Sequence, residues 1–250
     1  DIHNERKPHY RNKDSFAKIT SNVDSLLKLG ISVSIRINTD PYTMERADEL
    51  LDYFKEKGWL QYQNFKAYYA LLRKEVPIKG ENGEYSKEMF TQSSFFCTYL
   101  QKGLEKQGCG KVMCQDYSVR SVLTNMLLGK STPYKSHFCG AQSGMIIFDP
   151  LGDIYSCWDV VGQREYRVGH YMPDFVLEDT FADKWFDSRV SKFSCIKCKY
   201  VLFCGGGCLA NAIRTTGNLQ SGTCNDYPRL FNAEIKYIYN EKIKKGIDEN

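Results

Sequence analysis

Seven cysteines in the second half of the chain are spaced as ligands of inorganic centres. With Gly152 between the first two, they read C-x12-G-x4-C, then C-x2-C-x5-C-x3-C, then a single C. Thiolates are the soft ligands that select zinc or iron–sulfur centres, so this pattern predicts a metal-binding region. The seven are Cys139, Cys157, Cys195, Cys198, Cys204, Cys208 and Cys224.

The densest part of the pattern is able to surround a metal centre at low entropic cost. Cys195, Cys198 and Cys204 are separated by two and five residues, so little chain must be closed to bring their thiols together. The three glycines before Cys208 would let the chain turn sharply and approach sulfur closely. The residues alone leave two interpretations open. A pair of ribbon-type zinc sites explains the shortest spacing, whereas iron–sulfur centres fit seven cysteines better than zinc sites, which favour fours.

Composition limits the class of protein. A chain of 250 residues with 42% hydrophobic and 14% aromatic content forms one large domain or two modest ones. The net charge of +4 comes without a basic stripe, so no nucleic-acid partner is expected. No apolar run of membrane-spanning length and no signal peptide is present, which predicts a cytoplasmic protein with reduced thiols and no membrane partner. The abrupt start at Asp1 suggests part of a longer polypeptide.

The first half predicts an α/β fold. Apolar residues at helical spacing alternate with strand-like segments, which is typical of βα units around a parallel sheet. Ligands gather at the carboxyl ends of such strands, here residues 36–40 and 73–85. The expected elements are a helix over 13–29, a strand over 31–38, a helix over 43–57, a strand over 65–72 and a helix over 87–106.

The second half predicts shorter elements around the cysteines. Residues 145–148 and 153–156 flank the turn sequence Asp-Pro-Leu-Gly at 149–152, so we expect a hairpin that returns Cys157 toward Cys139. Helices are expected near 119–127, 181–190, 206–215 and 228–245.

The complete pattern of seven cysteines and Gly152 resembles the SPASM domain of radical S-adenosylmethionine enzymes. The resemblance implies two auxiliary [4Fe-4S] clusters. It assigns Cys139, Cys157 and Cys208 to the first cluster. It assigns the second cluster to Cys195, Cys198, Cys204 and Cys224.

The first half begins with Asp-Ile-His-Asn-Glu-Arg at 1–6, followed by the helix that contains Phe16 and the strand over 31–38. These segments resemble the stretch that follows the middle of the radical S-adenosylmethionine barrel. The implied fold is the C-terminal half of a partial (β/α)6 barrel over residues 1–110. A bridging helix and a small α+β cysteine-rich SPASM domain would follow over 111–250. The polar face of the first strand, Ser34, Arg36 and Asn38, would line the lumen where S-adenosylmethionine sits. The alternative for this face is an ordinary solvated sheet surface.

Two departures from the family pattern limit what is expected of the chain. The C-x3-C-x2-C loop, which holds the cluster that cleaves S-adenosylmethionine, does not occur in the sequence. The polypeptide as given is therefore not expected to be active alone, and is either a C-terminal part or a degenerate member. Pro133 also stands where some members have a fourth cysteine for the first cluster, which leaves Cys109, Cys114, substrate or no ligand.

The resemblance implies oxidative modification of a peptide or protein, with ferredoxin or flavodoxin as electron donor. We expect a ribosomal peptide maturase that forms a thioether or carbon–carbon crosslink. Auxiliary clusters would accept an electron or bind substrate. Anaerobic sulfatase maturation is the first alternative, but in that group an aspartate directly follows the cysteine matching Cys157. Here Trp158 intervenes, and Asp159 is the catalytic candidate one position later. A non-catalytic peptide-binding module, stabilised by zinc or clusters, is the second alternative.

Overall fold

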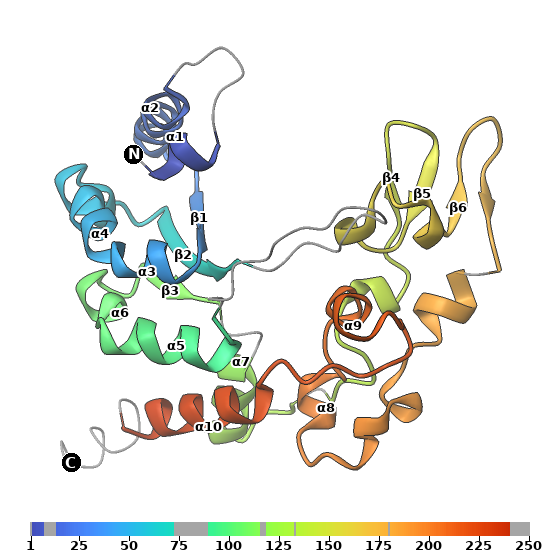
Figure 1. Ribbon diagram of the computed structural model, residues 1–250. Coiled ribbons are helices and arrows are strands. Elements are labelled where there is room, and N and C mark those ends of the chain that lie inside the picture. The colour runs from blue at the N-terminus through green and yellow to red at the C-terminus, as the bar shows by residue number, and fades with distance from the viewer. Residues whose placement is uncertain are drawn as a thin grey trace. The chain divides into compact units, whose positions relative to one another are not determined.

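The structure is a computed structural model, and its described residues form two compact units (Figure 1). The first unit contains the described residues up to 115 and the second those from 119 onward. No helix in the described part is long and apolar enough to cross a membrane. The expected ligand-binding stretch 73–85, Pro133 and the end of the last predicted helix, 241–245, lie outside the described residues. The structure describes residues 2–7, 14–72, 90–115, 119–132, 134–179 and 181–240.

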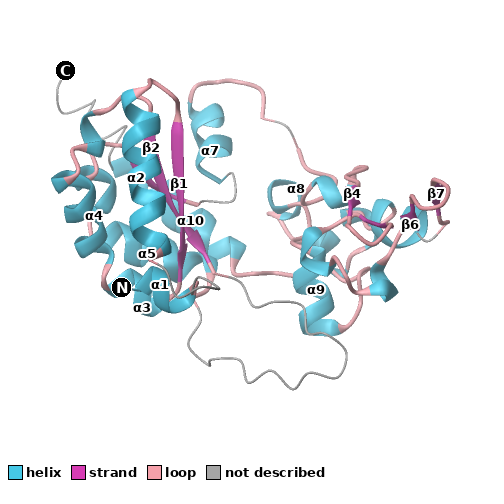
Figure 2. Cartoon of the chain, turned by 90° about the horizontal axis from the view of Figure 1, so that it is seen from above, coloured by secondary structure: helices cyan, strands magenta, loops and turns pink. Residues whose placement is uncertain are grey.

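The first unit is a three-stranded parallel sheet with helices between its strands. The sheet order is β1-β2-β3, and both pairings are parallel, as predicted for a mixed α/β unit. Figure 2 shows β1 and β2 side by side among the helices. In chain order the elements are α1 (Ile2–Arg6), α2 (Ser15–Lys28), β1 (Val33–Thr39), α3 (Pro41–Glu45), α4 (Ala47–Glu56), β2 (Phe65–Leu71), α5 (Gln92–Gln101), α6 (Leu104–Gln107) and β3 (Val112–Cys114).

Local chemistry explains these boundaries. Asp14 caps α2, because its carboxylate accepts the backbone N–H of Ala17 at 2.9 Å. The predicted helix over 43–57 is two helices, since Pro41 starts a short one and Arg46 separates it from the next. The predicted helix over 87–106 likewise breaks at Gly103, which has a positive φ of 64°. The three-residue strand β3 was not predicted, because it is too short to show a period.

The second unit combines a small antiparallel sheet with short helices. The sheet order is β4-β5-β6-β7, and all three pairings are antiparallel. The two-residue strands β6 and β7 were not predicted. The elements are α7 (Val119–Leu127), β4 (Ile147–Phe148), β5 (Asp153–Tyr155), β6 (Gly169–His170), β7 (Val176–Leu177), a π-helical segment (Phe181–Phe186), α8 (Val201–Cys204), α9 (Leu209–Thr216) and α10 (Tyr227–Ile238).

The predicted hairpin before Cys157 is confirmed, and its turn is held by a buried aspartate. The Asp149 carboxylate accepts backbone N–H groups of Leu151 at 2.8 Å and Asp153 at 2.9 Å. Gly152 supplies a positive φ of 100° at the turn. The Tyr171 hydroxyl donates to the Asp149 carbonyl at 2.5 Å, which ties the turn to the following strand.

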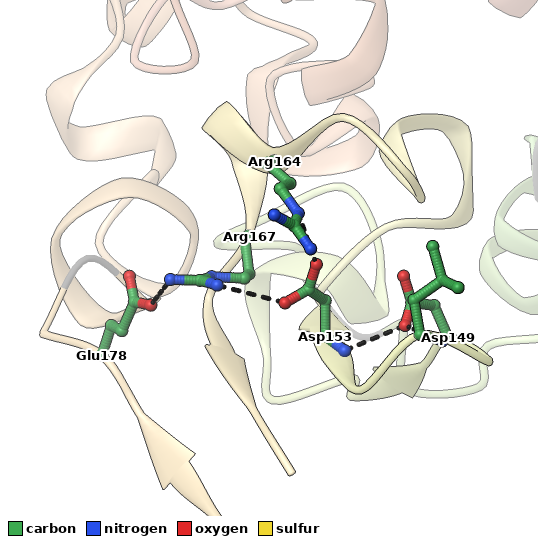
Figure 3. A network of polar contacts seen from close by, with 6 residues as sticks. Asp149, Asp153, Arg164, Arg167 and Glu178 are labelled. Carbon is green, nitrogen blue, oxygen red and sulfur yellow. Dashed lines mark hydrogen bonds and ion pairs between the residues drawn. The ribbon is translucent and has the colours of Figure 1, made fainter. Parts of the chain in front are cut away.

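A network of ion pairs holds the connection between β5 and β6 against β5 (Figure 3). Asp153 is 5% exposed and pairs with Arg164 at 3.2 Å and with Arg167 at 3.1 Å. Arg167 also bonds Glu178 at 2.7 Å, just beyond β7. Because one arginine joins two carboxylates, the network links the strands that precede and follow β6.

Substitution of Asp153 tests this network. We expect Asp153→Ala to lower the free energy of unfolding by about 2 kcal/mol, because two charge-assisted contacts are lost at a buried position. The measurement is urea denaturation followed by circular dichroism. Asp174→Ala changes an exposed aspartate in the connection between β6 and β7 and should have little effect. Equal effects of the two substitutions would contradict the assigned role.

Candidate metal centre

Three consecutive glycines form the turn around which the cysteine segments meet. Gly205, Gly206 and Gly207 have positive φ values of 74°, 84° and 86°. Side chains here would overlap other segments: a Cβ at Gly205 would meet the carbonyl oxygen of His137, and one at Gly207 would meet that of Thr223. The turn therefore packs directly against the segments that lead to Cys139 and Cys224.

A Cβ at Gly206 would overlap the ring of Phe193, two residues before Cys195. The glycines thus pass close to backbone and ring atoms of other segments, and the predicted approach to sulfur occurs at Gly206, whose backbone N–H bonds the Cys204 sulfur. Gly222 also lies close to sulfur, since a Cβ there would lie 2.7 Å from the Cys195 Sγ. The predicted helix over 206–215 begins only at Leu209, because these positive φ values are not helical.

Cys139, Cys157 and Cys208 lie close together and form the first thiol set. Burial raises the pKa of the Cys157 thiol to about 12. The charges of Asp159, Cys208 and Cys139 act in the same direction, so these groups lie near Cys157. The backbone N–H of Asp159 bonds the Cys157 sulfur, and that of Gln142 bonds the Cys139 sulfur.

Cys195, Cys198, Cys204 and Cys224 form the second thiol set. The pKa of Cys195 is raised by burial and then by the charges of Cys198 and Cys224. Burial raises the pKa of Cys204 to about 11, with Cys224 and Cys195 adding to the shift. The backbone N–H of Gly206 bonds the Cys204 sulfur and opposes it. Two groups of thiols therefore lie in this unit.

The oxidation state and the grouping of the thiols are compatible with iron–sulfur centres. The ten cysteines are thiols and not disulfides. Raised pKa values keep the buried thiols protonated at neutral pH, so a bound metal must displace their protons. Across the described ranges, no group of three or more His, Cys, Asp or Glu side chains is arranged to hold a metal ion. A tetrahedral zinc ion needs its sulfurs about 3.8 Å apart, given Zn–S bonds of about 2.3 Å. A cubane places its thiolates on separate irons, and therefore further apart.

Asp159 lies beside the first thiol set in an ion pair. Its carboxylate pairs with the Arg214 guanidinium at 3.0 Å, and the Arg214 side chain is only 9% exposed. Arg214 lies on α9, which begins directly after Cys208. Asp159 is thus held near the first thiol set by its ion pair with Arg214.

The polar residues of β1 lie together on one exposed face. Ser34, Arg36 and Asn38 are exposed, whereas Ile37 between them is buried. The Arg36 Nε donates to the Asn38 Oδ1 at 3.0 Å, so these two side chains form one polar surface. Cys109 and Cys114, the candidate extra ligands, are also in the first unit; Cys109 is exposed and Cys114 is 7% exposed on β3.

Comparisons with known proteins place the fold of this chain among solved structures. No protein-family model matches the sequence. The Serine-type anaerobic sulfatase-maturating enzyme of Bacteroides thetaiotaomicron is 22% identical over 261 residues, which cover 95% of this chain and 60% of that protein. The structure of native anSMEcpe with bound AdoMet aligns with a TM-score of 0.58 at 18% identity, covering 92% of this chain and 61% of the other. The same protein with AdoMet and the Kp18Cys peptide gives a TM-score of 0.58 at 19% identity, covering 92% and 63%.

The chain resembles a C-terminal portion of a radical S-adenosylmethionine/SPASM enzyme. It spans about 60% of the length of the curated relative and of the solved structures it matches. At these identities the structural likeness establishes the fold. The radical S-adenosylmethionine/SPASM resemblance read from seven cysteines is therefore supported by independent sequence and fold matches.

The sequence interpretation missed two residues beside the first thiol set. Arg214 gave no signal, because its partner Asp159 is 55 positions away. Gln142 did give one, since Cys139-x-x-Gln has the spacing of a capping box, and the structure forms that box.

The close approach at Gly207 can be tested by a single methyl group. We expect Gly207→Ala to reduce stability by about 3 kcal/mol and to lower the metal bound by both thiol sets, because the methyl overlaps the Thr223 carbonyl. Gly217→Ala is the matched control: it has a similar φ of 68° with nothing within 4 Å. It should cost only about 1 kcal/mol. Thermal unfolding and iron analysis measure both, and similar losses would show that backbone strain alone matters.

Proposed function

We propose that this chain is the auxiliary-cluster portion of a radical S-adenosylmethionine/SPASM enzyme that oxidatively modifies a peptide or protein. The observation that carries the proposal is the division of seven thiols into two neighbouring groups. Cys139, Cys157 and Cys208 would hold a first [4Fe-4S] cluster, and Cys195, Cys198, Cys204 and Cys224 a second. A set of three leaves one coordination position for another protein group or for substrate.

The chain's own residues have defined tasks in this proposal. Iron–sulfur clusters supply one-electron acceptance when bound. Backbone N–H groups of Gln142, Asp159 and Gly206 donate to ligand sulfurs and stabilise their negative charge. Arg214 and Asp159 place a charged pair beside the three-cysteine set, where Asp159 is our candidate for receiving a substrate proton.

The first unit would supply the later strands of a partial (β/α)6 barrel, and residues after 110 the bridging helix and SPASM domain. Its parallel order β1-β2-β3 supports this arrangement. Ser34, Arg36 and Asn38 would face S-adenosylmethionine from β1. That cofactor and its own cluster require a C-x3-C-x2-C loop, so they belong to a longer polypeptide, with ferredoxin or flavodoxin as donor.

A peptide or protein is the proposed substrate, and two reactions compete. The curated relative is a Serine-type anaerobic sulfatase-maturating enzyme, which favours maturation of a sulfatase serine. The structure of anSMEcpe with the Kp18Cys peptide favours a peptide substrate. The departures at Trp158 and Asp159 favour a peptide maturase that makes a thioether or carbon–carbon crosslink. These two possibilities have about equal support. A non-catalytic peptide-binding module is a third candidate, since no ligand-bearing C-x3-C-x2-C loop occurs in this sequence.

Metal analysis tests the cluster assignment. Anaerobically prepared protein should contain about eight iron and eight sulfide per chain, four of each for every cubane. Replacing Cys195 and Cys198 together with alanine should reduce both to about four, because only the second set is broken. Cys97→Ala, in α5 of the first unit, should leave both unchanged. Zinc without sulfide in protein made with iron supplied would reject the redox role and favour the binding module.

Product analysis separates the two reactions. A longer polypeptide that carries the cluster loop should be incubated with S-adenosylmethionine and a reductant. One reaction receives a peptide with the sulfatase serine, and the other receives a ribosomal peptide. Two-electron oxidation of a serine side chain gives an aldehyde, which a hydrazide reagent captures. Formation of a crosslink removes the same two hydrogens from the peptide but closes a ring. The ring resists fragmentation in the mass spectrometer and does not react with the hydrazide reagent. Mass spectrometry distinguishes these products, and reductive cleavage of S-adenosylmethionine with neither would contradict both assignments.

A further inference from the structure

Gln142 is a completely buried polar residue at the first thiol set, with 0% of its surface exposed. Its side-chain oxygen accepts the backbone N–H of Phe138 at 3.0 Å and of Cys139 at 3.3 Å. Its own backbone N–H donates to the Cys139 carbonyl at 3.1 Å and also, in the capping box, to the Cys139 sulfur. Gln142 therefore holds the Cys139 turn through its side chain and the Cys139 thiol through its backbone.

The other end of the Gln142 side chain reaches a different segment. Its Nε2 donates to the backbone carbonyl of Ser188 at 2.6 Å. The Ser188 hydroxyl is itself buried and donates to the Lys184 carbonyl at 2.6 Å. Nearby, the Val190 N–H donates to the Ser136 carbonyl at 3.0 Å, so the two segments are joined on both sides of Cys139.

The joined segment leads directly to the second thiol set. Val190 begins a short 3₁₀ turn, Val190–Lys192, and Phe193 then caps the turn Ser194–Lys197 that carries Cys195. A continuous chain of hydrogen bonds thus runs from the Cys139 thiol to the segment that presents the second set. A buried amide with both ends bonded fixes the positions of its partners, because breaking it leaves polar groups unpaired.

We propose that Gln142 is the positioning residue of the first cluster. It aims the Cys139 thiol and keeps a backbone N–H on its sulfur, which makes reduction of the cluster easier. This inference rests on the proposed function, since it requires that Cys139 bind a cluster. It extends that function by naming a residue that acts through a ligand without binding iron itself.

The test compares Gln142→Leu with the wild-type chain after anaerobic reconstitution. Leucine has similar volume but neither donor nor acceptor, so the Cys139 turn should loosen. We expect at least twofold lower occupancy of the first cluster, or a more negative midpoint potential, with the second cluster unchanged. Iron analysis and redox titration followed by electron paramagnetic resonance measure these quantities, and Cys139→Ser identifies the signal of the first cluster.

A double-mutant comparison separates positioning from general packing. If Gln142 acts through Cys139, adding Gln142→Leu to Cys139→Ser should change the first cluster no further. Equal effects in both backgrounds would overturn the proposal, as would an unchanged midpoint and occupancy in the single variant. Gln92→Leu is the matched control, because Gln92 is a buried glutamine, 6% exposed, in the first unit.

A measurement on the wild-type chain covers the case in which Gln142→Leu does not fold. With ¹⁵N-labelled glutamine, pulsed electron paramagnetic resonance of the reduced first cluster should show a weak ¹⁵N coupling from the Gln142 N–H. No such coupling would overturn the proposal. A wild-type chain that binds no cluster at all would instead reject the proposed function, so the two failures are distinguishable.

Discussion

The second unit depends on one steric constraint, the absence of side chains at Gly205, Gly206 and Gly207. At these positions the backbone lies against His137, Phe193 and Thr223, which belong to three different segments. Each segment carries or adjoins a cysteine of the pattern. A methyl group at any of the three would push one segment away. The thiol sets exist because this turn lets the segments meet.

That approach creates an electrostatic problem that metal binding would solve. Burial moves the pKa of Cys157 from 9.0 to about 12, so forming its thiolate costs on the order of 4 kcal/mol more than in water. Without metal the thiol stays neutral. A bound cation offsets this cost and releases protons, which couples cluster binding to the stability of the unit. Backbone N–H donors at the sulfurs reduce the same cost without adding charge.

One ion pair, Asp159–Arg214, lies beside the first thiol set. Asp159 and Arg214 form a pair in which the arginine is nearly buried, while Trp158 beside them is 70% exposed. The pair holds a carboxylate near the first set, and the attraction between the two charges offsets part of the cost of burying the arginine.

The sequence by itself predicted a metal-binding region and much of the fold. Cysteine spacing indicated the metal-binding region, whereas the division into two ligand groups came from the resemblance to the SPASM domain. Strict alternation in 31–38 and the Asp149 turn predicted β1 and the hairpin, since both signals are local. The tertiary structure decided what local signals cannot carry. It formed the short strands β3, β6 and β7, and brought Arg214 to Asp159 and Gln142 to Ser188. These contacts join residues distant in sequence, so only the folded chain specifies them.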